Sequence, residues 1–177
     1  CPYEFSNYGD IYWEGIPTTN NSYAYNENDN EYKPASFFIK LLVKAAARNG
    51  NILMNIGPMG NGKFSLPDKT ILKGIADWWK VNGESSIRGT KATPLAVQSW
   101  GETTRKGNKL YLHVFDWPED GKLCVGGLLT DVKRAYLLSN PQKNLKCVRS
   151  GKDLWVDVPL NCPDTVNTVI ALECTSE

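Results

Sequence analysis

The sequence predicts an α/β segment followed by an all-β domain. Apolar residues recur with helical spacing over residues 34–49 and 68–82, and an apolar run that ends in Gly57-Pro58 lies between them. The order helix, buried strand, loop, helix is the unit of an α/β barrel or of a doubly wound parallel sheet. From Leu95 onward the apolar residues instead alternate with polar ones, as in the strands of an antiparallel sandwich.

Each of the two predicted helices carries one continuous apolar stripe with the spacing of a buried helix face. The stripes consist of Phe38, Leu41, Leu42, Ala45 and Ala46 in the first helix, and of Ile71, Leu72, Ile75, Trp78 and Trp79 in the second. Ser65 precedes the second helix as a candidate N-cap. Gly50 follows the first helix, where a glycine often ends a helix in the left-handed conformation.

The apolar run at residues 52–56 is expected to form a buried strand. Residues 10–13 are expected to form a second, short strand with Glu14 at its carboxyl end. In α/β barrels the loops at the carboxyl ends of the strands build the active face. Asn55 and Met59 lie near that end of the first strand, although Asn55 could equally pair with backbone groups.

The second half contains short strand candidates that are separated by Gly, Pro, Asn and Asp turns. They are residues 95–97, 109–115, 122–125, 132–138, 146–148, 154–158 and 168–173. Residues 83–93 contain Gly, Ser and Thr and precede Pro94, a composition that suits a boundary between domains. We therefore divide the chain into residues 1–90 and residues 91–177.

Composition excludes several classes of function. The chain has 177 residues, is 41% hydrophobic and carries a net charge of +1. It has no basic cluster for nucleic acid, no apolar run of membrane-spanning length and no recognisable signal peptide. A complete (β/α)8 barrel needs about 200 residues or more, so the α/β part alone cannot form one. Because the chain begins at Cys1 without Met, we expect a mature product or an excised fragment.

Five cysteines, at positions 1, 124, 147, 162 and 174, show neither a Cys-x-x-Cys pair nor the spacing of a metal site. Because the count is odd, at least one thiol has no partner within the chain. Disulfides of a secreted protein and small buried thiols both fit the pattern. Nothing else in the sequence marks a disulfide scaffold, which favours buried thiols.

Three motifs, in this order, resemble the α-L-fucosidases of glycoside hydrolase family 29. They are YWEGIPTTNNSYAYN at residues 12–26, NGNILMNIGPMGNGK at 49–63 and LKGIADWWKVNGESSIRGT at 72–90. GNKLYLHVFDWP, at residues 107–118, also resembles the first hairpin of the β-sandwich that follows the barrel in that family. The resemblance implies the terminal strands and helices of a (β/α)8-type barrel plus an antiparallel β-sandwich, and hence the C-terminal part of a larger enzyme.

The resemblance also implies a reaction. Retaining glycosidases use two carboxyl groups about 5–5.5 Å apart, one as the nucleophile and the other as the acid/base. In the family the nucleophile is an Asp at the end of an earlier barrel strand, and no residue of this chain matches it. We therefore expect the chain alone to be inactive. The parent enzyme is expected to hydrolyse terminal α-L-fucosyl linkages without a metal or an organic cofactor.

Two carboxylates are candidates for the acid/base. In the family this residue lies on a loop before the Trp-Glu strand, and Glu4 stands in such a segment between Tyr3 and Phe5. Apolar neighbours raise the pKa of a carboxyl group, as a general acid requires. Glu14 is the second candidate, and it could instead be a carboxylate of the substrate site. Each also fits an ordinary role, Glu4 as a loop carboxylate and Glu14 in a salt bridge at the barrel rim.

Tyr23 corresponds to the aromatic residue that packs against fucose in the family, and an aromatic wall suits the apolar surface of that sugar. Trp13 is a further substrate-binding candidate, with a structural role as its more common use. The only histidine, His113, lies in an alternating strand and is expected to be structural, so no catalytic triad or zinc site is predicted. Three tryptophans of the second half fit either a sandwich core or a sugar-binding platform: Trp100, Trp117 and Trp155.

The sequence thus favours the C-terminal portion of a retaining α-L-fucosidase whose substrate is a fucosylated glycan. The alternative is a non-catalytic carbohydrate-binding or structural β-sandwich module. A second carboxylate supplied from outside the chain would distinguish the enzyme from the module. The open edge of a partial barrel also predicts that the chain either associates with itself or buries the strand at residues 52–56 against the sandwich. The resemblance implies a secreted, periplasmic or lysosomal-like compartment.

Overall fold

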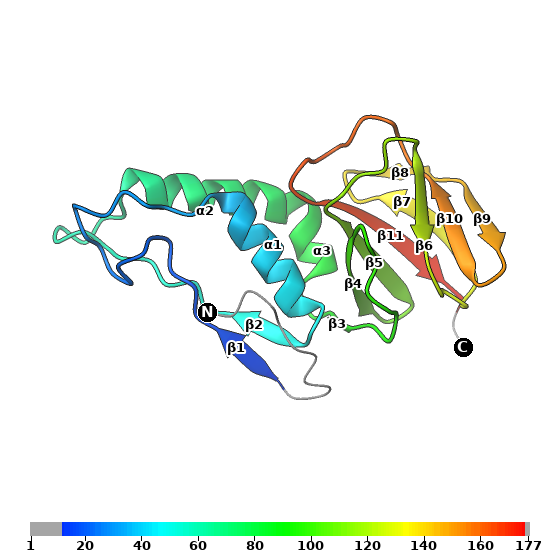
Figure 1. Cartoon of the computed structure of the whole chain (residues 1–177), viewed down its shortest axis with the longest axis horizontal. Helices are drawn as coiled ribbons and strands as arrows, with labels where there is room; N and C mark the ends of the chain where they lie inside the picture. The colour runs from blue at the N-terminus through cyan, green and yellow to red at the C-terminus, as the bar shows by residue number, and fades with distance from the viewer. Residues whose placement is uncertain (1–11, 176–177) are drawn as a thin grey trace. The chain divides into compact units, whose positions relative to one another are not determined.

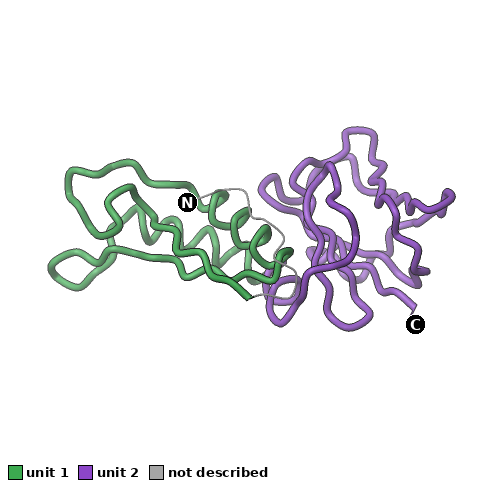
Figure 2. Tube along the Cα trace, turned by 60° about the horizontal axis from the view of Figure 1, so that its bottom comes forward, with its two compact units in different colours: residues 1–80 green, residues 81–177 purple. Residues whose placement is uncertain are grey.

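The structure is a computed structural model that describes residues 12–175, and Figure 1 shows the order of its elements. The chain divides into two compact units, residues 1–80 and residues 81–177 (Figure 2). Two residues that follow the 80/81 boundary, Ser86 and Arg88, bond to side chains of the second unit. There the Thr104 hydroxyl donates to the Ser86 carbonyl (2.6 Å), and Lys106 Nζ donates to the Arg88 carbonyl (3.0 Å).

The first unit contains two consecutive strand–helix pairs. In chain order these are β1 (Trp13–Gly15), α1 (Ala35–Ala46), β2 (Gly50–Ile52) and α2 (Leu66–Trp78), and a π-helical turn at Trp79–Gly83 follows them. β1 and β2 are parallel, and α1 packs against both β2 and α2. Alternating parallel strands and helices of this kind are the repeating unit of a (β/α)8-type barrel.

Local chemistry accounts for the helices and their ends. Ser65 caps α2, since its Oγ accepts from the Asp68 N–H (3.2 Å) and donates to Asp68 Oδ2 (2.7 Å). α1 packs against both β2 and α2, and it buries Ile39 and Val43 in addition to three residues of the predicted stripe: Phe38, Leu41 and Ala45. The left-handed residue after α1 is Asn49 (φ 55°), not the predicted Gly50.

Gly50 is required for a different reason, which also assigns a structural task to Trp13. A Cβ at position 50 would lie 2.3 Å from the Trp13 ring, so the indole rests directly on the glycine backbone. The Trp13 Nε1–H donates to the carbonyl of Arg48 (2.9 Å). The side chain of Trp13 therefore joins β1 to the segment that connects α1 with β2.

The second unit is an antiparallel β-sandwich, as predicted. It begins with a one-turn helix, α3 (Glu84–Ser86), and continues with β3 (Lys91–Ala92), β4 (Gly101–Lys106), β5 (Lys109–Val114), β6 (Lys122–Val125), β7 (Val132–Leu137), β8 (Asn140–Asn144), β9 (Cys147–Ser150), β10 (Asp153–Asp157) and β11 (Thr168–Cys174). One sheet has the order β3-β4-β5-β11-β7-β8, and the other has the order β6-β10-β9.

Alternating side chains of both sheets form the sandwich core. The six-stranded sheet contributes Leu112, Ile170 and Leu172, and the three-stranded sheet contributes Leu123 and Val156. β11 pairs on both sides, with β5 and β7, and is buried over most of its length, so it is the central strand of the fold. The four described cysteines, at positions 124, 147, 162 and 174, carry free thiols.

The strands that sequence patterns missed are the polar ones. β4 reads Gly-Glu-Thr-Thr-Arg-Lys, and β8 is exposed throughout. Residues 95–97 were expected to form a strand but lie in a loop where Val97 is 79% exposed. The neighbouring segment that does pair is β3, whose partner is β4.

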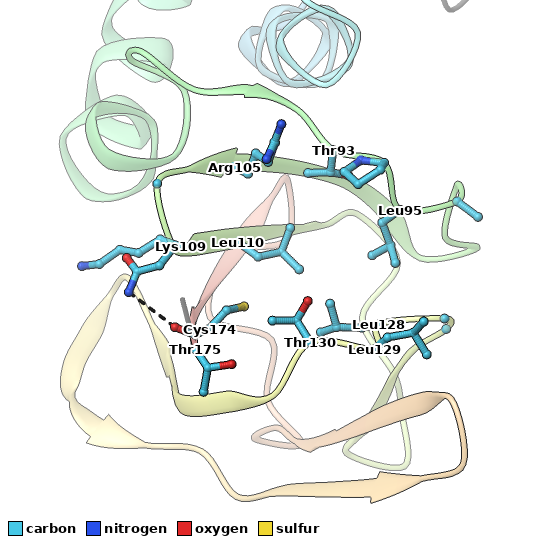
Figure 3. A pocket seen from close by; sticks show the side chains of 16 residues that line it. Thr93, Leu95, Arg105, Lys109, Leu110, Leu128, Leu129, Thr130, Cys174 and Thr175 are labelled. Atoms are coloured by element: carbon cyan, nitrogen blue, oxygen red, sulfur yellow. Dashed lines mark hydrogen bonds between the residues drawn. The ribbon is translucent and has the colours of Figure 1, made fainter. Parts of the chain in front are cut away.

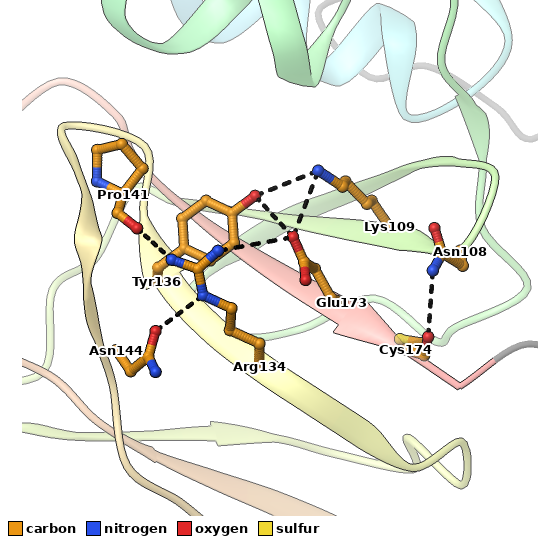
Figure 4. A network of polar contacts seen from close by, with 8 residues as sticks. All are labelled: Asn108, Lys109, Arg134, Tyr136, Pro141, Asn144, Glu173 and Cys174. Carbon is orange, nitrogen blue, oxygen red and sulfur yellow. Dashed lines mark hydrogen bonds and ion pairs between the residues drawn. The ribbon is translucent and has the colours of Figure 1, made fainter.

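A polar network ties four strands together on the face of the larger sheet that points away from the core (Figure 4). Glu173 Oε1 accepts from the Tyr136 hydroxyl (3.3 Å) and lies 3.4 Å from Lys109 Nζ. Hydrogen bonding to Tyr136, and secondarily the Glu173 carboxylate, raises the pKa of Lys109. Arg134 stacks 4.4 Å above the Tyr136 ring and donates through Nε to Asn144 Oδ1 (2.8 Å), which joins β7 to β8.

His113 is a buried structural residue, with none of its surface exposed. Its Nε2 lies 3.0 Å from Thr104 Oγ1 and its Nδ1 lies 3.3 Å from Asn167 Oδ1, so both ring nitrogens have a polar neighbour. Burial lowers the pKa of His113 from 6.5 to about 4, a loss that hydrogen bonding to Asn167 only partly offsets. The imidazole is therefore neutral in the folded protein at neutral pH.

The pKa of His113 predicts a loss of stability in acid. Above pH 6.5 the ring is neutral in both states, whereas between pH 6.5 and about 4 only the unfolded chain binds the proton. The free energy of unfolding should therefore fall by about 3 kcal/mol across this window because of this group. Chemical denaturation at a series of pH values measures it. If a His113→Gln variant lost the same free energy of unfolding between pH 6.5 and 4, the prediction would be contradicted.

Candidate functional site

The candidate site lies at the carboxyl edge of the two parallel strands. Because β1 and β2 run in the same direction, the loops that follow them, residues 16–34 and 53–65, start from one edge of the sheet. In (β/α)8 barrels this edge forms the active face. The loop after β1 carries Tyr23, and the loop after β2 carries the Asn-Ile-Gly-Pro segment at residues 55–58.

Proline interrupts the pairing of these segments but does not end it. The Leu53 N–H donates to the Gly15 carbonyl (3.0 Å), and the Asn55 N–H donates to the Pro17 carbonyl (2.8 Å). Pro17 has no N–H to return to residue 53, which is why the regular ladder stops after three residues. Pairing resumes at the Thr18–Asn55 bridge, where the Thr19 N–H donates to the Asn55 carbonyl (3.3 Å).

The run at residues 52–56 is consequently not the buried strand that its sequence predicts. β2 covers Gly50–Ile52, and the side chain of Leu53 is 53% exposed. The helix α1 covers only one face of the strand pair, so alternate residues of the run have no layer to pack against within the first unit.

Asn55 and Gly57 hold the loop after β1 in place. The side-chain Nδ2 of Asn55 donates to the backbone carbonyl of Tyr23. A Cβ on Gly57 would lie 2.0 Å from the Tyr25 nitrogen and 2.4 Å from the Ala24 carbonyl carbon, so two backbone segments meet here with no room for a side chain. The motif quoted above contained both residues, but spacing alone did not reveal their contacts.

Hydrogen bonds from polar side chains hold the same loop together. Asn20, which is 4% exposed, donates through Nδ2 to the Ala24 carbonyl (3.0 Å), and Lys33 Nζ donates to the Asn20 carbonyl (3.1 Å). Asp29 accepts from the Ser22 hydroxyl (2.6 Å) and from the Asn21 N–H (3.0 Å). The Ser22 bond, first among several, holds the pKa of Asp29 below its usual range.

Tyr23 lies at the exposed part of this loop. Its side chain is 61% exposed, and its backbone has φ 62°, a left-handed conformation that is uncommon for a bulky residue. Residues in such conformations persist only where the surroundings hold them, and they cluster at binding sites. The exposed ring could therefore serve as a wall for an apolar surface.

The other predicted site residues are placed unevenly. Glu14 is the middle residue of β1, not the residue after the strand, and its side chain is exposed and lies on the opposite face from Trp13. Trp13 is half-buried in the contacts with Gly50 and Arg48 described above. Glu4 lies outside the described residues.

The three tryptophans considered for a sugar platform do not share one surface role. Trp100 is buried in the sandwich core and donates from Nε1 to the Cys124 carbonyl (2.7 Å). Trp117 is half-buried and donates to the Pro159 carbonyl (2.8 Å). Trp155 is 38% exposed, on β10.

A pocket of about 660 Å³ opens at one end of the sandwich (Figure 3). Leu95, Leu110, Leu128 and Cys174 form its apolar part, and Thr93 and Thr130 add hydroxyl groups. Among residues 12–175, no Asp or Glu lines it. These lining residues therefore offer no carboxyl group for the chemistry of a glycosidase.

Within residues 12–175 the structure contains no helix with the length and hydrophobicity of a membrane span. In the same residues no three His, Cys, Asp or Glu side chains form a group that could hold a metal ion.

Comparisons with known proteins identify the family. A sequence profile of the α-L-fucosidase family matches residues 3–84. The α-L-fucosidase of Dictyostelium discoideum is 33% identical over 122 residues, which cover 64% of this chain and 25% of that protein. Isoenzyme 1 of the α-L-fucosidase from Paenibacillus thiaminolyticus superposes with a TM-score of 0.86 at 32% identity, over 94% of this chain and 40% of that chain. The chain belongs to the α-L-fucosidase family.

The likeness to fucosidase structures extends over both units of the chain. A Bacteroides thetaiotaomicron α-L-fucosidase of glycoside hydrolase family 29, trapped as a covalent intermediate with 2-fluoro-fucosyl fluoride, superposes with a TM-score of 0.84 at 25% identity. The superposition covers 93% of this chain and 38% of that chain. The fold class predicted from the sequence is thus confirmed. The chain spans about a quarter of the length of the curated fucosidases that it matches.

The close approach at Gly57 predicts a large effect of a small substitution. Gly57→Ala should destabilise the first unit by about 1–3 kcal/mol, because backbone atoms of residues 24–25 occupy the space of the new methyl group. Gly60→Ala is the matched control, since a Cβ there meets no atom within 4 Å. Denaturant titration followed by circular dichroism measures both variants, and equal midpoints would contradict the prediction.

Proposed function

We propose that this chain is the C-terminal portion of a retaining α-L-fucosidase that hydrolyses terminal α-L-fucosyl linkages in glycans. In this proposal the first unit supplies the last strands and helices of the catalytic barrel, and the second unit is its C-terminal β-sandwich. One observation carries the proposal: the Tyr23 loop and the Asn-Ile-Gly-Pro segment meet at the carboxyl edge of parallel strands in a family of fucosidases. No comparison favours the alternative of a non-catalytic module.

Tyr23 is the proposed substrate wall. Its ring is exposed on a loop whose backbone is held by Asn20, Asp29 and Asn55. The apolar face of a fucose ring and its methyl group can pack on such a surface. Trp13 stays a weaker candidate because its indole already packs on Gly50 and bonds to Arg48.

Glu14 is proposed to point into the barrel. It lies on the strand face away from Trp13, which is the residue that contacts the α1–β2 connection. Because helices cover the outside of a (β/α)8 barrel, the opposite strand face points to its interior. Glu14 can therefore serve as a substrate-site carboxylate or as the acid/base, with Glu4 as the other candidate for the acid/base.

The nucleophile is proposed to come from barrel strands that this chain does not include. Retention needs a second carboxylate about 5–5.5 Å from the acid/base, and no residue of this chain matches the family's nucleophile segment. A covalent intermediate, as in the Bacteroides thetaiotaomicron relative, requires that group. The acid/base and the sugar wall alone cannot form it.

The chain alone should consequently show no fucosidase activity. Purified residues 1–177 should leave an aryl α-L-fucoside unhydrolysed, while the full-length enzyme hydrolyses it, because only the latter holds both carboxyl groups. Release of the aryl alcohol measures the difference. Turnover by the chain that persists through successive purification steps would contradict the proposal.

The uncovered strand face also predicts self-association. Tyr12, Ile16 and Leu53 are 75%, 43% and 53% exposed. Ile16 directly follows β1 and Leu53 directly follows β2, so both continue strands whose side chains alternate between a covered and an open face. Exposed apolar side chains on an uncovered strand face favour association in water. Sedimentation velocity should show a concentration-dependent shift, and Leu53→Lys should reduce it. A monomer at all concentrations would contradict this expectation.

The assignment of the acid/base to Glu4 over Glu14 is testable in the full-length enzyme. Glu4→Ala should slow hydrolysis of fucosides with poor leaving groups by about 100-fold or more, and activated aryl fucosides far less, because these need little protonation. Added azide should restore turnover by attacking the covalent intermediate. If Glu14→Ala gives this pattern and Glu4→Ala resembles the wild type, the assignment is reversed. If neither gives it, the acid/base lies outside this chain.

A further inference from the structure

We infer that Asn55 and Gly57 are positioning residues that set the conformation of the proposed sugar wall at Tyr23. We call Asn55 and Gly57 the positioning pair. The part of this inference that concerns the sugar rests on the proposed function. The part that concerns the loop rests on contacts within the first unit alone.

The backbone of Asn55 is fixed before its side chain acts. Its N–H donates to the Pro17 carbonyl (2.8 Å), and its carbonyl accepts from the Thr19 N–H (3.3 Å). Both backbone groups of residue 55 are therefore bonded to the segment after β1. The side chain then reaches along the same loop and donates from Nδ2 to the Tyr23 carbonyl. A rigidly held donor of this kind selects one orientation of the Tyr23 peptide group.

Tyr23 needs such a partner because its own side chain does little to fix it. The ring is 61% exposed, and the backbone has a left-handed φ of 62°. An L-residue with a bulky side chain disfavours that region, so the conformation has to be held by contacts elsewhere. The hydrogen bond from Asn55 is a contact to the residue itself.

Gly57 supplies the second restraint, which acts on the two residues that follow Tyr23 in the loop. The backbone at residue 57 lies so close to residues 24–25 that a Cβ would meet the Tyr25 nitrogen at 2.0 Å. This approach fixes the height of the loop above the strand segment, while Asn55 fixes the orientation of the peptide. Asn55 and Gly57 come from one short segment, so the loop after β2 orders the loop after β1.

The positioning pair should affect substrate binding more than the chemical step. Asn55 acts through Tyr23, and a wall that packs against a sugar binds the ground state and the transition state alike. Loss of such uniform binding raises KM and leaves kcat nearly unchanged. Loss of an acid/base instead lowers kcat.

Hydrogen exchange of residues 1–177 tests the loop. Asn55→Asp removes the donor with little change in size, and Asn55→Ser is a shorter second variant in case the carboxylate perturbs folding. Protection of the Asn21, Glu31 and Lys33 amides, all bonded within the loop, should fall about tenfold, while α1 and α2 stay protected. Asn61→Asp is the control, since its Oδ1 still accepts from the Lys63 N–H. Unchanged protection in both Asn55 variants would overturn the inference.

Steady-state kinetics of the full-length enzyme tests the effect on the sugar. Asn55→Asp should raise KM for an aryl fucoside about fivefold to tenfold with kcat within about twofold. In the Tyr23→Ala background the same substitution should change KM little, because its effect passes through the ring. Additive effects on KM, or a fall in kcat alone, would overturn the positioning role. A wild-type enzyme without fucosidase activity would instead contradict the proposed function, and hydrogen exchange would still decide the role of the pair in the loop.

Discussion

Parallel pairing between residues 13–19 and 50–55 determines where both loops of the candidate site begin. The pairing is short, and two features make it specific. Trp13 rests on a glycine that no other residue could replace at that distance, and Pro17 withholds one donor from the ladder. The missing hydrogen bond separates β1 and β2 from the bridge at Thr18 and Asn55. Beyond that bridge, side-chain hydrogen bonds rather than strand pairing hold the loop that contains Tyr23.

The second unit is organised around a buried strand. Its central strand, β11, is hydrogen-bonded on both edges and is buried on both faces. The buried side chain of His113, on the neighbouring strand β5, has polar partners in Thr104 of β4 and in Asn167, which directly precedes β11. The described residues that line the pocket at the end of the sandwich include no Asp or Glu, and the acid/base candidates proposed above belong to the first unit.

Sequence patterns predicted both helices, one helix cap and most of the apolar strands, although they misplaced the buried strand at residues 52–56 and the glycine cap at Gly50. The apolar periods of α1 and α2, the Ser65 cap and strands such as β6 and β11 follow from residue spacing. They could not predict β4, whose Thr-rich strand is polar yet partly buried, or the edge strand β8. The contacts of Asn55 and Gly57 were also beyond reach, because they join residues more than thirty positions apart and depend on how two loops meet.

Exposed apolar residues have different meanings in the two units. In the second unit Val97, Leu129 and Leu160 are strongly exposed, but each lies in a loop, where a single apolar side chain is ordinary. In the first unit Ile16 and Leu53 continue the alternation of parallel strands whose other face is covered by α1. A parallel sheet is normally covered on both faces. The uncovered face therefore supports the proposal that further barrel strands, including the one with the nucleophile, complete this unit in the enzyme.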